Sequence, residues 1–354
     1  MTDFVGLTWD HPRGRDALEA AAGRVTGGDS LRWEVHSLEG FESSPIEELA
    51  RRYDLIVLDH PHLGDALASS SIRPLDELFT AQELGAWASE AVGPSTASYT
   101  VDGRQWALPL DAATQVSARR ADLVPDAPAS WDAALALAES GLVAPSIAGP
   151  HAFLTLCSIA VSLGEEPAGH PERLLSRPVA RDALDILRSL ADSAPAGVLG
   201  LNPIGMLEHL AERDDLGYVP LVYGYVTYSP TVTFAAPPTA GGRIGSTIGG
   251  TGIAITRRTE PTPALLDHLR WLLSAEAQEG FIPQHAGQPS ARTAWTGPFY
   301  GPTLETVEQS WVRPRFPGYV PFQSEGSAII RGGLESDPEG ALDALDAAYR
   351  KALA

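Results

Sequence analysis

Trp106-Ala-Leu-Pro-Leu-Asp-Ala-Ala-Thr-Gln-Val-Ser-Ala-Arg-Arg120 is the stretch that decides the fold. It indicates a short apolar strand, a proline, an aspartate and a second strand-like run. The chain before this stretch has a different pattern from the chain after it. We therefore interpret it as a crossover between two lobes, with Asp111 and Gln115 facing the gap between them.

Length and charge limit the classes of function. With 354 residues, the chain can form two packed cores, because single cores stop growing at about 250–300 residues. Its 45 acidic and 25 basic residues give a net charge of −20, which argues against a nucleic-acid partner. No run approaches the roughly 20 apolar residues of a membrane span, so we expect no membrane insertion.

The first residues bear on location. Met-Thr-Asp leads directly into the apolar run Phe4–Thr8, with no charged region, long apolar stretch or cleavage site of an export signal. This predicts a cytoplasmic protein. A periplasmic or extracellular location is the alternative if a signal peptide has been trimmed.

The first third of the chain alternates strands and helices. Apolar or alternating runs at Phe4–Thr8, Leu31–Val35 and Tyr53–Leu58 predict strands. Ala- and Glu-rich segments at Asp16–Arg24 and Pro45–Arg52 predict the helices between them. This order is typical of a doubly wound α/β fold with parallel strands. Helices then dominate until a glycine-rich strand at Thr247–Ile255 returns to the α/β pattern.

Several further stretches support the crossover, and their order in the chain is more specific than any one of them. They are Ala107–Gln115, Gly249–Ile255, Leu272–Gly280, Gly287–Arg292 and Arg313-Pro-Arg315. Together they resemble the extracellular solute-binding protein family 1, the maltose-binding-protein-like receptors of ABC importers. The resemblance implies a two-lobed periplasmic-binding-protein fold of type II, with a hinge and an interlobe cleft that holds a ligand.

The resemblance also implies how the chain divides. Lobe 1 comprises residues 1–110 and 247–295, and lobe 2 comprises residues 111–246 and 296–354. An ABC permease is the implied protein partner if the chain is exported. The resemblance further places His285 on a loop near the cleft.

Two predicted strand ends carry nearly the same polar signature. They are Trp9-Asp10-His11-Pro12 and Leu58-Asp59-His60-Pro61-His62. In open α/β sheets, ligands bind at the carboxyl ends of the strands, so both are candidate cleft edges. If the two strands are neighbours, His11, His60 and His62 lie close to one another.

Four roles are open to this cluster. A histidine beside a carboxylate suits general acid–base catalysis, or the cluster could bind an anion at a helix N-terminus. Histidine and aspartate are also suitable metal ligands, but no fixed ligand spacing is present, and we expect no metal. The remaining alternative is structural: Asp-His-Pro caps the following helix.

Other candidates lie beyond the crossover. Asp111 and Gln115 are predicted to hydrogen-bond a ligand, although Asp111 could instead bend the hinge. Tyr223 and Tyr225 flank Gly224 and could form a stacking wall or pack in a core. The run Gly249-Gly-Thr-Gly252 lacks a phosphate-binding lysine and a full dinucleotide fingerprint, so it predicts a tight turn and no cofactor.

Two functions follow. The first is a solute-binding-protein-like module that closes on a small polar organic ligand. The alternative is an intracellular enzyme of isomerase, lyase or cyclase type on the same fold. In that case Asp59 and the histidines at positions 11, 60 and 62 would supply acid–base catalysis or hold a reactive substrate shape. The sequence leaves open whether chemistry takes place.

Overall fold

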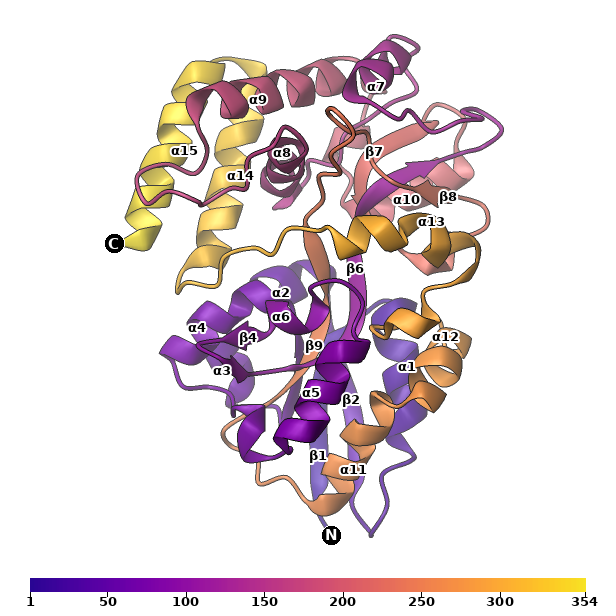
Figure 1. Cartoon of the computed structure of the whole chain (residues 1–354), viewed down its shortest axis with the longest axis vertical. Helices are drawn as coiled ribbons and strands as arrows, with labels where there is room; N and C mark the ends of the chain where they lie inside the picture. Colours follow the sequence, from indigo (N-terminus) through magenta and orange to yellow (C-terminus); the bar gives the residue numbers. More distant parts are fainter.

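A computed structural model describes all residues, 1–354. The chain forms two lobes joined by strands that pass from one to the other (Figure 1). The strands make one seven-stranded sheet in the order β2-β1-β3-β9-β6-β7, with β8 paired to the far part of β6. The strands are β1 (Asp3–Trp9), β2 (Ser30–His36), β3 (Leu55–Leu58), β6 (Leu108–Arg119), β7 (Tyr218–Tyr223), β8 (Thr233–Ala235) and β9 (Ile248–Ile255).

The predicted α/β order of the first lobe is confirmed. Strands β1, β2 and β3 are parallel, and α1 (Pro12–Ala22) connects the first two. All four residues of β3 are buried, as expected for a strand covered on both faces. Strand β9 then pairs antiparallel with β3 and carries the chain back into this lobe.

Strand β6 is the crossover. Its residues Leu108–Thr114 pair with β9, whereas the part from Gln115 to Arg119 pairs with β7 and β8 of the second lobe. Eleven of its twelve residues are buried. The register shifts between Pro109 and Asp111, where proline lacks the N–H that a regular ladder needs. The two predicted strands are therefore one bulged strand.

Helices cover both lobes. The first lobe also contains α2 (Leu38–Ser43), α3 (Ile46–Ala50), α4 (Leu63–Ala68), α5 (Ala81–Glu90), α6 (Ser95–Ser98), α11 (Pro263–Leu272) and α12 (Ile282–Gln284). A small hairpin of β4 (Thr100–Val101) and β5 (Arg104–Gln105) has a turn with positive φ at Asp102 and Gly103.

The second lobe is mainly helical. Its helices are α7 (Trp131–Ala138), α8 (His151–Ser162), α9 (Arg177–Asp192), α10 (Pro203–Glu212), α13 (Gly297–Glu308), α14 (Tyr319–Glu335) and α15 (Pro338–Leu353). Every residue of α8 is buried beneath α9 and α14. Helices α13 and α14 were not predicted.

The hydrophobic core divides with the lobes. One cluster of 31 buried residues draws only on residues 124–349 of the second lobe. Another, of 21 residues, draws only on residues 4–110 and 253–282. A third cluster, of 19 residues, combines Val92 and Trp295 with residues of the second lobe, so the predicted division of the chain stays a prediction. No helix is both long and apolar enough to cross a membrane.

Candidate ligand-binding cleft

Two small cavities lie between the lobes. Their volumes are about 50 and about 20 Å³, and Glu42, Asp59 and Tyr223 line both of them. Trp9 ends β1 and Asp59 follows β3, so the cavities lie at the carboxyl ends of two strands, where α/β sheets place their ligands. We refer to the two cavities together as the inner cleft.

A buried ion pair joins the lobes at the inner cleft. Arg313 Nη2 lies 2.5 Å from Asp59 Oδ2, and the Arg313 side chain is only 3% exposed. Burial raises the pKa of Asp59, but the charge of Arg313 and the contacts of His60 outweigh it and hold this pKa well below its usual range. Asp59 is therefore ionised and bound to the opposite lobe.

A second buried pair was not foreseen from the sequence. Arg13 Nε and Nη2 lie 2.7 and 3.0 Å from the two carboxylate oxygens of Asp111. The guanidinium also stacks on Tyr225 at 4.6 Å and reaches the carbonyl oxygen of Gly224 at 3.4 Å. Asp111 was predicted to face the gap, but it lines neither inner cavity, and its carboxylate is occupied by Arg13. The only feature of the sequence that pointed to Arg13 is its position in the first turn of α1, directly after a strand that ends at the cleft.

Aromatic rings form much of the remaining wall. Trp9 and Phe41 pack at 5.1 Å between ring centroids, and Tyr223 and Tyr225 line the larger cavity with them. Gly249 allows this packing, because a Cβ there would lie 2.6 Å from Tyr223 Cε1. The glycine run is part of strand β9 rather than a separate tight turn, although Gly250 does have a φ of +84°.

Several polar atoms of this wall are buried without a hydrogen-bond partner. They are Trp9 Nε1, Tyr223 Oη and Arg313 Nε. Nearby, Glu42 Oε1 lies 3.2 Å from His151 Nε2 of the other lobe, without hydrogen-bond geometry. Buried polar groups are nearly always paired in folded proteins, and these atoms have no partner within the protein.

Asp10 and His11 have structural roles. The side chain of Asp10 is 53% exposed and pairs with Arg15, so it does not reach the cleft. His11 is the N-cap of α1, where Nδ1 accepts a hydrogen bond from the Arg13 N–H at 3.1 Å. Burial and the charge of Arg13 lower the pKa of His11 to about 4. Of the four roles proposed from the sequence, His11 therefore has the structural one, in which it caps the following helix.

The two other histidines have separate surroundings. His60 is completely buried against Tyr99 inside lobe 1, and burial and Arg313 lower its pKa to about 4. His62 lines the smaller inner cavity, and its pKa is also lowered by burial. Of the histidines at the two strand ends, only His62 reaches the cleft, and no group of His, Cys, Asp or Glu is arranged to hold a metal ion.

Gln115 and His285 do not line the inner cleft. Gln115 is fully buried and fixes the crossover to α8, since its Oε1 accepts from Ser158 at 2.6 Å. His285 stacks on Phe281 at 4.1 Å beside α12. Of the ten predicted ligand-binding residues, the structure brings Trp9, Asp59, Tyr223 and Tyr225 together at the cavities, with Asp111 behind Arg13.

The sequence matches no protein-family profile and no curated protein. The fold, however, matches many solved structures. A solute-binding protein of an ABC transporter from Agrobacterium radiobacter, in complex with ribitol, superposes with a TM-score of 0.83 at 20% identity, covering 99% of this chain and 98% of the other. The chain therefore has the two-lobed fold of ABC-transporter solute-binding proteins.

Two further structures show the same likeness. A solute-binding protein from Thermotoga lettingae, bound to α-D-tagatose, gives a TM-score of 0.80 at 14% identity over 100% of this chain and 99% of that one. The maltotriose-binding protein of Thermus thermophilus, bound to maltotriose, gives 0.78 at 16% identity over the full length of both chains. The predicted fold class is confirmed.

Proposed function

We propose that the protein is a solute-binding module that closes its two lobes on a small polar organic ligand. The observation that carries this proposal is the composition of the inner cleft. Both lobes contribute to its wall, and Trp9, Tyr223 and Arg313 each leave a buried polar atom without a partner there. A ligand with hydroxyl or similar groups would satisfy these atoms and stack on the aromatic rings.

The likeness in fold supports the same class of ligand. The three structural neighbours described above hold ribitol, α-D-tagatose and maltotriose, all polyhydroxylated compounds. We propose Trp9, Asp59, Tyr223, Tyr225 and Arg313 as the ligand-binding residues. Arg13 and Asp111 would hold Tyr225 in place, because the guanidinium lies over its ring.

Acid–base catalysis finds less support. A general base working near neutral pH needs a pKa in that range and access to the substrate. His11 is engaged as a helix cap, and His60 is sealed inside lobe 1, with pKa values lowered to about 4. His62 alone of the three lines an inner cavity, and burial lowers its pKa as well.

Binding can be tested without knowing the ligand. Native mass spectrometry and thermal shift against a panel of polyols, monosaccharides and oligosaccharides should detect at least one binder. Tyr223→Ala should weaken that binding by at least about tenfold, because it removes both a ring and a hydroxyl from the wall. Leu353→Ala at the exposed end of α15 serves as the matched control. Absence of any binder would contradict the proposal.

The partner and the location are part of the proposal. An ABC permease would receive the ligand if the protein works outside the cytoplasmic membrane. A cytoplasmic location would instead favour a sensor or carrier role. Cell fractionation of the source organism distinguishes the two, and stimulation of transporter ATPase activity by the loaded protein tests the permease directly.

A further inference from the structure

Glu42 carries the one charge in the wall of the inner cleft that no opposite charge balances. It lines both cavities from the last turn of α2, and no arginine or lysine lies within ion-pair distance of it. The other charged side chains of the wall are paired, Asp59 with Arg313 and Arg13 with Asp111 behind it. The inner cleft therefore has a net negative charge.

His151 is the only basic side chain within 4 Å of Glu42, and it is a poor counter-charge. The ring is 2% exposed, and neither of its nitrogens forms a hydrogen bond. His151 is also the first residue of α8, where the helix dipole opposes a positive charge. The other histidine of the wall is His62, and burial lowers its pKa. Glu42 therefore remains an unbalanced carboxylate.

Two aromatic rings beside Glu42 are suited to attract a positive charge. Arg13 already lies over the ring of Tyr225, but no arginine lies over the ring of Phe41 or Tyr223, which line the larger cavity with Glu42. The face of an aromatic ring attracts cations. A cavity needs roughly 10–15 Å³ to hold a group of the size of water. The larger cavity, of about 50 Å³, therefore has room for an ammonium group.

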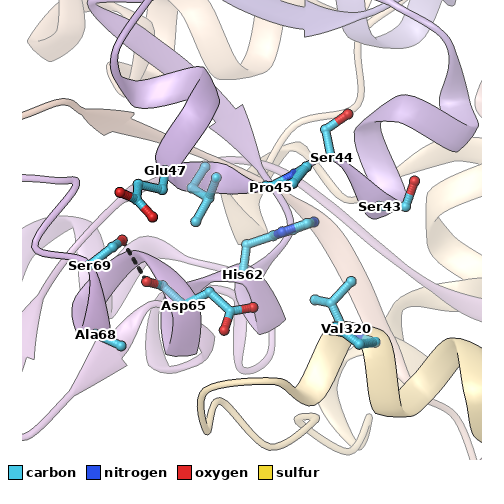
Figure 2. A pocket seen from close by; sticks show the side chains of 11 residues that line it. Ser43, Ser44, Pro45, Glu47, His62, Asp65, Ala68, Ser69 and Val320 are labelled. Atoms are coloured by element: carbon cyan, nitrogen blue, oxygen red, sulfur yellow. Dashed lines mark hydrogen bonds between the residues drawn. The ribbon is translucent and has the colours of Figure 1, made fainter.

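The space that adjoins the inner cleft is acidic as well. A pocket of about 490 Å³ beside α3 and α4 shares His62 and Val320 with the smaller inner cavity. Figure 2 shows Glu47 and Asp65 in the wall of this pocket, which contains no arginine or lysine. Glu47 pairs with Arg51, whereas Asp65 has no cationic partner. Together with the net charge of −20, this surface favours the approach of a cation over that of an anion.

We infer that the ligand of the inner cleft carries a positively charged amino group, and that Glu42 binds this group and so determines specificity. The inference rests on the proposed function and narrows the ligand to an amino-substituted polyol or sugar. The ammonium group donates charge-assisted hydrogen bonds to the carboxylate. Because Glu42 belongs to α2 and Tyr223 to β7, the two lobes hold the group between them.

The test compares each amine with its hydroxyl parent on the full chain. Calorimetric titration at about pH 7 would use ribitol and 1-amino-1-deoxyribitol, sorbitol and 1-amino-1-deoxysorbitol, glucose and glucosamine, and galactose and galactosamine. At least one amine should bind at least about tenfold more tightly than its parent. In Glu42→Gln this advantage should disappear, and in Glu42→Ala as well. Both variants should fold, because the Glu42 side chain forms no hydrogen bond within the protein.

A matched control separates the charge of Glu42 from that of the molecule. Glu48→Gln makes the same change on an exposed position of α3 that lines neither inner cavity, and it should leave the advantage intact. If parents bind and no amine binds more tightly than its parent, the inference is wrong and the proposed function stands. An advantage that survives in both Glu42 variants would also overturn the inference. Binding of neither amines nor parents would contradict the proposed function, and the inference with it.

Discussion

At the scale of single residues, the inner cleft is organised by two arginines. Arg13 and Arg313 are each about 3–6% exposed, and each is paired with an aspartate at a predicted cleft position. The pair of Arg13 and Asp111 fixes a wall, whereas the pair of Arg313 and Asp59 connects the lobes. Replacing Asp111 by asparagine should therefore weaken the wall, whereas replacing Asp59 by asparagine should weaken the connection between the lobes.

Asp111→Asn should lower the stability of the fold. It leaves the Arg13 guanidinium buried without its counter-charge, and breaking a buried pair by removing one partner costs about 3–5 kcal/mol. Urea unfolding followed by circular dichroism measures the change. Glu339→Gln is the control, because its pair with Arg181 is more than half exposed on both sides. Equal midpoints for the two variants would contradict this assignment.

Gly249→Ala should disturb the cleft wall. The new Cβ would meet the Tyr223 ring at 2.6 Å, and this overpacking should cost about 1–3 kcal/mol and move a proposed ligand contact. Thermal unfolding and titration with an identified ligand measure the two effects. Gly301→Ala in α13 is the matched control, since nothing lies within 4 Å of its Cβ position. If both alanines behave alike, Gly249 has no role in positioning Tyr223.

At the scale of elements, local sequence signals succeed where they do not depend on distant partners. Ser130 is the N-cap of α7, a role that serine favours, and its hydroxyl accepts from the Ala133 N–H at 3.2 Å. Helices α10 and α15 both begin with a proline, which is a local signal for the start of a helix. In contrast, α13 contains Pro302 and α14 contains Gly326 and Gly333, residues that disfavour helix in isolation. Packing against the lobe core overrides that preference.

Ser130→Ala should weaken α7 by about 1 kcal/mol, because it removes the acceptor for a free N–H of the first helical turn. Hydrogen exchange of the α7 amides and the urea midpoint both report the loss. Ser130→Asn keeps a capping acceptor and should restore most of the stability. A variant series in which alanine and asparagine have the same effect would show that the cap contributes nothing.

At the scale of the whole molecule, the sequence predicted the two-lobed fold, and four of the ten predicted ligand-binding residues line the inner cleft. Trp9, Asp59, Tyr223 and Tyr225 were found because strand ends and aromatic alternation are local patterns. Arg13 was missed because its partner Asp111 lies 98 residues away, and pairing across that distance has no local signature. His285 was assigned from the position of its loop alone, and its ring packs on Phe281 instead.

Acid should destabilise the whole fold through buried histidines. Burial, with a contribution from a nearby arginine in each case, lowers the pKa of His11, His60 and His268 from 6.5 to about 4. Between these values the unfolded chain binds a proton at each site and the folded chain does not. Stability is therefore lost as the pH falls from about 6.5 to about 4, by roughly 3 kcal/mol for each histidine, and levels off below that range.

His268 is the best probe of this effect, because it lies away from the cleft, stacked with Trp271. His268→Phe retains an aromatic ring but cannot take up a proton, so the fall in unfolding free energy between pH 7 and pH 4.5 should shrink by about 2–3 kcal/mol. Urea unfolding at a series of pH values gives both curves. Above pH 7, imidazole is neutral in both the folded and the unfolded chain. The plots of unfolding free energy against pH should therefore have nearly the same slope for the two proteins in that range. Parallel curves throughout the acid range would show that His268 takes up its proton without unfolding, and the acid sensitivity would then have to come from His11 and His60.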